Sequence, residues 1–341
     1  MAATPGSTGI DSVDPTNSTT PSIHEVFPTP PFDEDPKADF ILESAEGHRF
    51  RVVKAILIHA SPVFETLLSL PQPPVVAVSS SNDHWEQQLD GGLPVVKVTE
   101  SSRTLDTLLR ICYPITSPHL DDLTEIDHVL EAALKYELEV AISELRKALQ
   151  APKFRDPSNA LVVFVIACRN KLGDDARRAA LDTLKGPFIP KFNPALAHIS
   201  AATYFHLQQY HIDASAVVSS MFTGEFLDIY PQDVHDIIVC SYNRCPDRRT
   251  TQDSCCATHN WRTRTAWWTR FRDRSNDIVK GIPLSDEVFT IGFIVQLIST
   301  AACSTCLPLV LSKWPAITDA LKTERDRLLS EVQIDLSGAG L

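Results

Sequence analysis

Hydrophobic positions form short, strand-like runs in the first third of the sequence. Three runs, DFILES (39–44), HRFRVV (48–53) and VVKV (95–98), are rich in the aliphatic and aromatic residues that favour strands. The AEG segment between the first two runs contains Gly47, which tolerates the positive φ of a tight turn. The pattern therefore predicts a small sheet.

Between the second and third runs the apolar spacing becomes helical. The segment KAILIHA (54–60) predicts a short helix. Ser61 and Pro62 fit the cap and the first position of a second helix, whose buried face begins with Phe64. Residues 71–94 read as a loop, because proline stands at both of its ends.

The rest of the chain reads as helical. Ser102 suits the cap of the next helix, and two more helices are expected near 123–136 and 140–149. Beyond Pro152 apolar residues keep a helical period to the end of the sequence. No internal repeat is evident in the pattern.

The order of these elements, with several short motifs, resembles the BTB/POZ domain. The motifs are Asp39, Leu57, Ser61-Pro62-Val63-Phe64, Leu109 with Tyr113, Ala132-Ala133 and Lys135-Tyr136. The Pro-rich loop and the segment VIACRNKLGDDARRAALDTL also resemble the fungal BTB-domain group. The resemblance implies an α+β BTB/POZ module, a small sheet with surrounding helices, followed by an all-α C-terminal region. We expect the module's core to contain Asp39, Leu57, Phe64, Leu108 and Tyr113.

Four parts follow from this interpretation. They are a disordered Ser/Thr/Pro-rich tail (1–36), the BTB/POZ domain (37–150), a helical region (151–236), and a helical region with a Cys/Arg/Trp-rich loop (237–341).

The resemblance also implies protein–protein interaction as the function. BTB/POZ domains form homodimers or heterodimers and recruit partners, so the expected partner is a second copy or another BTB protein. Some members are substrate adaptors of cullin-type ubiquitin ligases, which is the first alternative. Cullin-binding members carry an apolar-x-Glu signature in the loop after SPVF, where this chain has only Glu86, with His84 two residues earlier. Many members also have His-Lys where this chain has Val53-Lys54.

Charge and hydropathy argue against nucleic-acid binding and against a membrane span. The net charge of −12 opposes binding to phosphate backbones, so nucleic acid is not an expected partner of the whole chain. The run 288–311 has no charge, but it contains Gln296, several hydroxyl side chains and Pro308. We therefore expect a buried helix there and not a membrane span.

Six of the eight cysteines lie beyond residue 239. Cys303 and Cys306 have the spacing of half a zinc site, and a closed structural site could be completed from Cys245, Cys255, Cys256 and His259. The alternative is free thiols in a helical core. The first twenty residues lack the basic and apolar regions of a secretory signal, so we expect an intracellular protein of the cytoplasm or nucleus, not a secreted one.

The segment 244–274 holds eight Arg and three Asp, with Trp261, Trp267, Trp268 and Phe271 interleaved. Such a composition occurs in proteins that bind single-stranded nucleic acid, which gives a second alternative function, and at protein-binding surfaces. We favour a structural role, in which the aromatic rings pack on the helical domain and the Arg side chains face solvent or acidic groups.

Motifs of catalysis are absent from the sequence. It contains no Gly-rich phosphate loop, no G-x-S-x-G elbow and no H-E-x-x-H. His206 and His211 are five residues apart, which does not place them on one helix face, so we expect surface or core histidines. The sequence thus predicts a protein without enzymatic activity.

Overall fold

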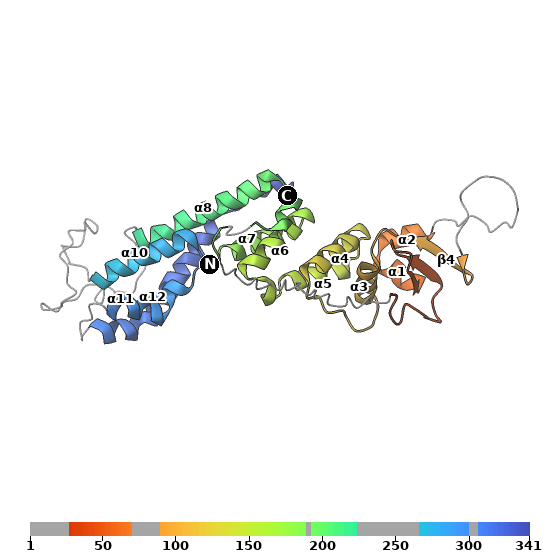
Figure 1. Cartoon of the computed structure of the whole chain (residues 1–341), viewed down its shortest axis with the longest axis horizontal. Helices are drawn as coiled ribbons and strands as arrows, with labels where there is room; N and C mark the ends of the chain where they lie inside the picture. Colours follow the sequence, from red (N-terminus) through yellow and green to blue (C-terminus); the bar gives the residue numbers. More distant parts are fainter. Residues whose placement is uncertain (1–26, 70–88, 189–191, 224–265, 300–305) are drawn as a thin grey trace, which may run out of the picture. The chain divides into compact units, whose positions relative to one another are not determined.

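The structure is a computed structural model of the 341-residue chain, and it describes residues 27–69, 89–188, 192–223, 266–299 and 306–341 (Figure 1). The chain divides into two compact units. The first contains Met1–Lys54 and Gln72–Asp106, and the second contains Ala55–Pro71 and Thr107–Leu341.

The first unit contains a four-stranded mixed sheet of order β2-β1-β4-β3. Its strands are β1 (Phe40–Glu43), β2 (Arg49–Val52), β3 (Leu89–Asp90) and β4 (Leu93–Lys97). β1 pairs antiparallel with β2 and parallel with β4, so Ile41 lies opposite both Arg51 and Val95. The expected small sheet is confirmed.

Strand β3 was not expected, because two residues are too few to show an alternating pattern. Leu89 and Asp90 fall within the segment predicted as a loop, and they pair with the start of β4. The turn between them is formed by Gly91 and Gly92, which both have positive φ. The Gly-Gly pair was the available signal of a hairpin.

Part of the segment assigned to the N-terminal tail packs in the first unit. Phe32 is fully buried, and its carbonyl accepts a hydrogen bond from the Arg51 amide at 2.8 Å. The ring of Phe32 lies 6.3 Å from that of Phe50 between centroids. Thr29 Oγ1 also donates to Asp106 Oδ1 at 2.8 Å. These contacts involve residues 29 and 32, ahead of the expected domain start at residue 37.

The second unit is helical. Its N-terminal helices are α1 (Lys54–Ala60), α2 (Pro62–Ser69), α3 (Ser102–Cys112), α4 (Leu123–Lys135) and α5 (Glu139–Leu149), of which α1 and α3 begin in the first unit. Ser61 caps α2 as expected: its Oγ accepts from the Phe64 amide at 2.9 Å and donates to the Tyr136 carbonyl at 2.5 Å. The Phe64 and Tyr136 rings stack at 4.7 Å. The link between Ser61 and Tyr136 thus fixes α2 against the end of α4.

Four of the five expected core residues are buried, and one is not. Leu57, Phe64, Leu108 and Tyr113 are buried. Asp39 is exposed, and its Oδ1 accepts a hydrogen bond from the Lys54 amide at 2.7 Å. The expectation that Asp39 lies in the core is therefore wrong, because its carboxylate stays in water and holds the first amide of α1.

The cap of α3 is displaced by one residue from the expected Ser102. Ser101 Oγ accepts from the Thr104 amide at 3.2 Å, while the Ser102 amide donates to Glu46 Oε2 at 2.8 Å. Glu46 lies in the turn between β1 and β2, so part of this cap comes from a distant segment. A local sequence pattern cannot show such a contact.

Two successive helical hairpins have the same structure. The first consists of α4 and α5, and the second of α6 (Pro157–Arg169) and α7 (Gly173–Thr183). Each first helix starts with an aspartate cap, Asp122 or Asp156, whose carboxylate accepts backbone amides. This structural repeat was missed in the sequence.

The C-terminal part packs around an aromatic core. The helices are α8 (Ala201–Thr223), α10 (Ala266–Gly281), α11 (Ile291–Ser299) and α12 (Cys306–Glu331), with short 3-10 turns at Pro152–Phe154, Pro194–His198, Glu287–Phe289 and Ser337–Ala339. α8 and α10 run antiparallel (Figure 1), because Ser215 Oγ donates to the Lys280 carbonyl and Arg272 Nε to the Phe222 carbonyl. The expectation of an all-α C-terminal region is confirmed.

The uncharged run 288–311 is not one helix. It contains the end of a 3-10 turn, α11 and the start of α12, and residues 300–305 lie outside the described residues. Val288, Phe293 and Ile294 are buried, and Trp314 Nε1 donates to the Phe289 carbonyl at 3.0 Å. Among the described helices, none combines the length and the apolar character that crossing a membrane requires.

Candidate functional site

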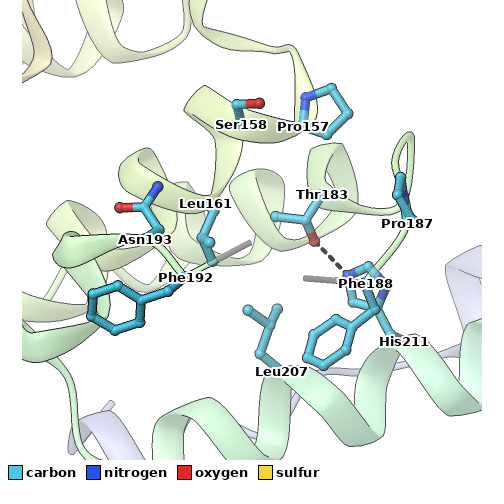
Figure 2. A pocket seen from close by; sticks show the side chains of 10 residues that line it. All are labelled: Pro157, Ser158, Leu161, Thr183, Pro187, Phe188, Phe192, Asn193, Leu207 and His211. Atoms are coloured by element: carbon cyan, nitrogen blue, oxygen red, sulfur yellow. Dashed lines mark hydrogen bonds between the residues drawn. The ribbon is translucent and has the colours of Figure 1, made fainter. Parts of the chain in front are cut away.

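A cavity of about 350 Å³ lies among α6, α7 and α8. We call it the α6–α8 cavity. Its lining consists of Pro157, Ser158, Leu161, Thr183, Pro187, Phe188, Phe192, Asn193, Leu207 and His211. Figure 2 shows Phe192 and Asn193 on one side of the view and Phe188 and His211 on the other. Residues 189–191, which join Phe188 to Phe192 along the chain, lie outside the described residues.

The buried polar part of this cavity is a hydrogen bond between Thr183 and His211, whereas the polar residues Ser158 and Asn193 are less buried. Thr183 Oγ1 and His211 Nε2 are 2.8 Å apart, and both residues are buried. Thr183 Oγ1 also donates to the Ala180 carbonyl at 2.5 Å, which uses its only proton. His211 Nε2 must therefore carry a proton and donate it to Thr183, and Nδ1 is the unprotonated nitrogen.

Burial keeps His211 neutral. Loss of hydration disfavours the imidazolium form and lowers the pKa of His211 from 6.5 to about 4. The Phe188 ring lies 4.6 Å from the His211 ring between centroids and covers part of it. At neutral pH the ring thus offers a lone pair and no charge.

A second feature of the helical region is a pair of buried carboxylates on α7. Asp175 is only 2% exposed, and it accepts hydrogen bonds from Arg146 Nε at 2.6 Å, Gln150 Nε2 at 3.0 Å and Arg178 Nη1 at 3.1 Å. Asp182, two turns further along α7, accepts from Arg155 Nε at 3.0 Å and from Lys185 Nζ at 2.5 Å. Arg146 and Gln150 belong to the end of the first hairpin, so these contacts join the two hairpins.

A third contact joins the first helices of the hairpins. Asp127 of α4 accepts from Arg169 Nη2 at 2.7 Å and from Asn170 Nδ2 at 3.2 Å. Burial raises the pKa of Asp127 above its ordinary value, although Arg169 opposes this shift. The hairpins are therefore held together at both ends of their interface.

A cluster of Ser102, His48 and Glu46 has the residue types of a hydrolase triad but not the arrangement. Ser102 Oγ lies 2.7 Å from His48 Nδ1 and 2.8 Å from Glu46 Oε2. The carboxylate takes the serine proton, so His48 donates to Ser102 and cannot act as its base. Burial raises the pKa of Glu46, but the hydrogen bonds from Ser102, Ser44 and the Glu46 backbone together outweigh it and leave that pKa lowered. The cluster is a helix cap.

The predicted zinc ligands cannot be placed. Cys245, Cys255, Cys256, His259 and Cys303 lie outside the described residues, and of Cys306 only its backbone position at the start of α12 is described. Within the described ranges, no group of three or more His, Cys, Asp or Glu side chains could hold a metal ion. Cys112 and Cys168 are free thiols, and burial raises the pKa of Cys112 to about 11 and that of Cys168 to about 12.

The described part of the Arg/Trp segment is structural. Trp267, Trp268 and Phe271 on α10 are buried, as expected. Phe271 contacts the rings of Trp268, Phe293 and Trp314 at centroid distances of 5.4, 6.1 and 5.3 Å. Buried rings are not available to stack on nucleic-acid bases. Trp261 and the first five arginines lie outside the described residues.

Sequence reasoning missed the Thr183–His211 contact. The sequence pattern relates His211 only to residues of its own helix, such as His206. Its hydrogen-bond partner Thr183 is the last residue of a different helix, α7. The two residues meet because Thr183, at the end of α7, lies beside His211 of α8, and no spacing rule within one helix reports that. The apolar residues around His211 were the one available signal of its burial.

Comparison with known proteins identifies one part of the chain. Residues 31–153 match the model of the BTB/POZ domain family. A search among curated proteins finds no relative of the chain. The matched residues contain the four-stranded sheet and helices α1 to α5. Residues 31–153 of this chain are therefore a BTB/POZ domain, a module that in general mediates protein–protein interaction.

Proposed function

We propose that this chain is a non-enzymatic interaction protein, in which the BTB/POZ domain mediates homodimerisation or heterodimerisation and recruits partners. The observation that carries the proposal is the match of residues 31–153 to a family of interaction modules. The cluster of Ser102, His48 and Glu46 also supports a non-enzymatic role. Its serine donates its proton to the capping carboxylate of Glu46 and not to a histidine base.

The helical region supports a role in presenting a partner. Arg146 and Gln150 lie within the BTB/POZ match, and Asp175 lies beyond it on α7. Their hydrogen bonds fix the α6–α7 hairpin to the end of the domain. The α6–α7 hairpin is thus fixed to helix α5 and offers further surface for a recruited partner beside this end of the domain.

The proposal is tested by the self-association of the full chain. Two differently tagged copies are co-expressed, and one is pulled down while sedimentation velocity gives the mass of the untagged protein over a hundredfold range of concentration. Recovery of the second tag and a dimer mass support homodimerisation. A monomer at every concentration, together with no BTB protein recovered from native cells, contradicts the proposal.

The same purification from native cells, followed by mass spectrometry, separates the proposal from the cullin-adaptor alternative. A cullin with its ligase subunits makes the chain a substrate adaptor. Other BTB proteins without a cullin leave it a dimerising module. The loop that contains Glu86 lies outside the described residues, so the binding experiment decides this point.

Two further expectations are kept as proposals with their own tests. Structural zinc predicts one equivalent of metal in the purified full chain and its loss in a Cys303→Ser, Cys306→Ser double variant; a metal-free wild type contradicts it. An intracellular location, in the cytoplasm or nucleus, is supported by the unpaired thiols of Cys112 and Cys168 and is tested by fractionation of native cells.

A further inference from the structure

We propose that the α6–α8 cavity binds an uncharged, largely apolar small molecule that carries one hydrogen-bond donor. The expected ligand class is a fused or substituted aromatic ring with a single N–H or O–H group. This site is additional to the protein–protein interaction proposed above, and neither depends on the other.

The size of the α6–α8 cavity suits a small molecule. The cavity volume of about 350 Å³ falls in the range of roughly 300–1,000 Å³ that is typical of small-molecule sites. A dry cavity of roughly 150 Å³ with apolar walls is already large enough for benzene. The α6–α8 cavity therefore has room for a two-ring ligand.

The described lining of the cavity is uncharged, which disfavours an ionic ligand. None of the ten lining residues carries a charge at neutral pH, since burial lowers the pKa of His211 to about 4. By contrast, the cavity of about 520 Å³ beside α7 and α12 contains Arg155, Arg177 and Lys185. An ion entering the α6–α8 cavity would lose hydration and find no opposite charge there, so the site favours a neutral ligand.

The direction of the hydrogen bonds leaves one acceptor atom on His211. Thr183 donates to Ala180 and accepts from His211 Nε2, which leaves His211 Nδ1 as an acceptor. Among the described hydrogen bonds of His211, the one to Thr183 uses Nε2 and none uses Nδ1. His211 lines the cavity, so a ligand N–H or O–H that donates to Nδ1 would add one hydrogen bond to the apolar contacts.

Residues from three regular helices form the walls of the cavity. Leu161 belongs to α6, Thr183 to α7, and Leu207 and His211 to α8, so regular helices position the apolar and polar groups. Phe192 is 79% exposed, and it lies on the side of the cavity away from His211 (Figure 2). An exposed aromatic ring at this side provides additional apolar surface for a ligand.

The test uses the full chain with indole and 1-methylindole as probes. The two molecules have nearly the same size, but only indole has an N–H group. Saturation-transfer NMR and calorimetry should show binding of indole, with roughly fivefold weaker binding of 1-methylindole, as expected for the loss of one hydrogen bond. No binding of either probe at millimolar concentration overturns the proposal, and equal binding overturns the role of His211 as acceptor.

Variants place the probe in the cavity. Ser158→Trp adds a ring at the exposed start of α6, and Leu161→Phe enlarges a wall residue, so each should reduce indole binding at least tenfold. Gln208→Trp is the matched control, because Gln208 is exposed on α8 and does not line the cavity. Thermal unfolding identifies any variant that fails to fold. Unchanged binding in both folded cavity variants would show that indole binds elsewhere and would overturn the site.

Discussion

Glu137 and Lys171 occupy equivalent positions in the two helical hairpins, and both adopt a left-handed backbone, with φ of 52° and 60°. Each follows the end of the first helix of its hairpin. The amide of the next residue, Leu138 or Leu172, donates to the carbonyl of Ala133 or Ala167. This is the hydrogen bond of a Schellman ending, which usually has glycine at the left-handed position.

This relationship defines the repeat. The aspartate caps Asp122 and Asp156 have the same separation in sequence as Glu137 and Lys171, which is 34 residues. The two hairpins therefore share the length of the first helix, the aspartate cap and the left-handed turn. The second hairpin continues the helical pattern of the BTB/POZ domain beyond residue 153.

We predict that Glu137→Gly stabilises the protein by about 0.5–1 kcal/mol. A side chain other than glycine is strained in the left-handed region, and Glu137 is exposed, so its replacement removes strain without emptying the core. The free energy of unfolding in urea measures the effect.

The matched control for this prediction is Glu139→Gly in the first turn of α5. Glycine there gains no relief from strain and increases the backbone entropy of the unfolded chain, so this variant should lose about 0.5–1 kcal/mol. Destabilisation by both substitutions would show that the left-handed turn at Glu137 is not strained.

We predict that Asp175→Ala lowers the free energy of unfolding by about 1–3 kcal/mol. It removes the acceptor shared by Arg146 and Gln150, which hold α7 to the end of α5, and by Arg178 of α7 itself. Because both arginines are partly exposed, they regain water, and the cost stays below that of leaving a fully buried charge unpaired.

The control for the Asp175 prediction is its neighbour Asp174. That side chain is 82% exposed and contacts only the exposed Arg177, so Asp174→Ala should change stability by less than about 0.5 kcal/mol. Equal effects of the two substitutions would argue against a structural role for the buried carboxylate. Hydrogen exchange of α7 would show the loosening directly.

We predict that Phe64→Ala costs about 3–5 kcal/mol. Phe64 is 2% exposed and stacks on Tyr136, so the substitution leaves a cavity and removes the ring contact. Phe205→Ala on α8 is the control, because that ring is 59% exposed, and it should change stability by less than about 0.5 kcal/mol. A loss below 1 kcal/mol at Phe64 would contradict its place in the core.

The sequence predicted the elements well where their signals are local. The cap at Ser61, the strands around Ile41 and Phe50, and the burial of Leu57 follow from residue type and spacing. Asp39 was wrongly placed in the core. Its position in a family motif shows that the residue type is characteristic, but does not show whether the side chain is buried or, as here, caps a helix.

What the sequence did not reveal depends on contacts between distant segments. The second hairpin was missed as a repeat because only positions such as the Asp122/Asp156 cap and the Leu138/Leu172 turn keep the same residue. The Thr183–His211 contact joins the end of α7 to the middle of α8, two segments that are 28 residues apart in the sequence. The buried carboxylate Asp175 looks like an ordinary polar residue of an amphipathic helix until α5 is placed beside it.

The last prediction concerns pH. Burial lowers the pKa of His211 to about 4, whereas the unfolded chain has its ordinary value of 6.5. Between these values the unfolded chain binds the proton and the folded protein does not, so the free energy of unfolding falls as the pH drops through this window and is unaffected by His211 above it. Within this window the loss of unfolding free energy due to His211 approaches about 1.4 kcal/mol per pH unit.

The variant His211→Gln tests this prediction, because glutamine does not titrate and its amide can still donate to Thr183. Urea unfolding from pH 7.5 to 4.5 should show a shallower decline in the free energy of unfolding for this variant than for the wild type. Parallel profiles of the two proteins would contradict a neutral, buried His211.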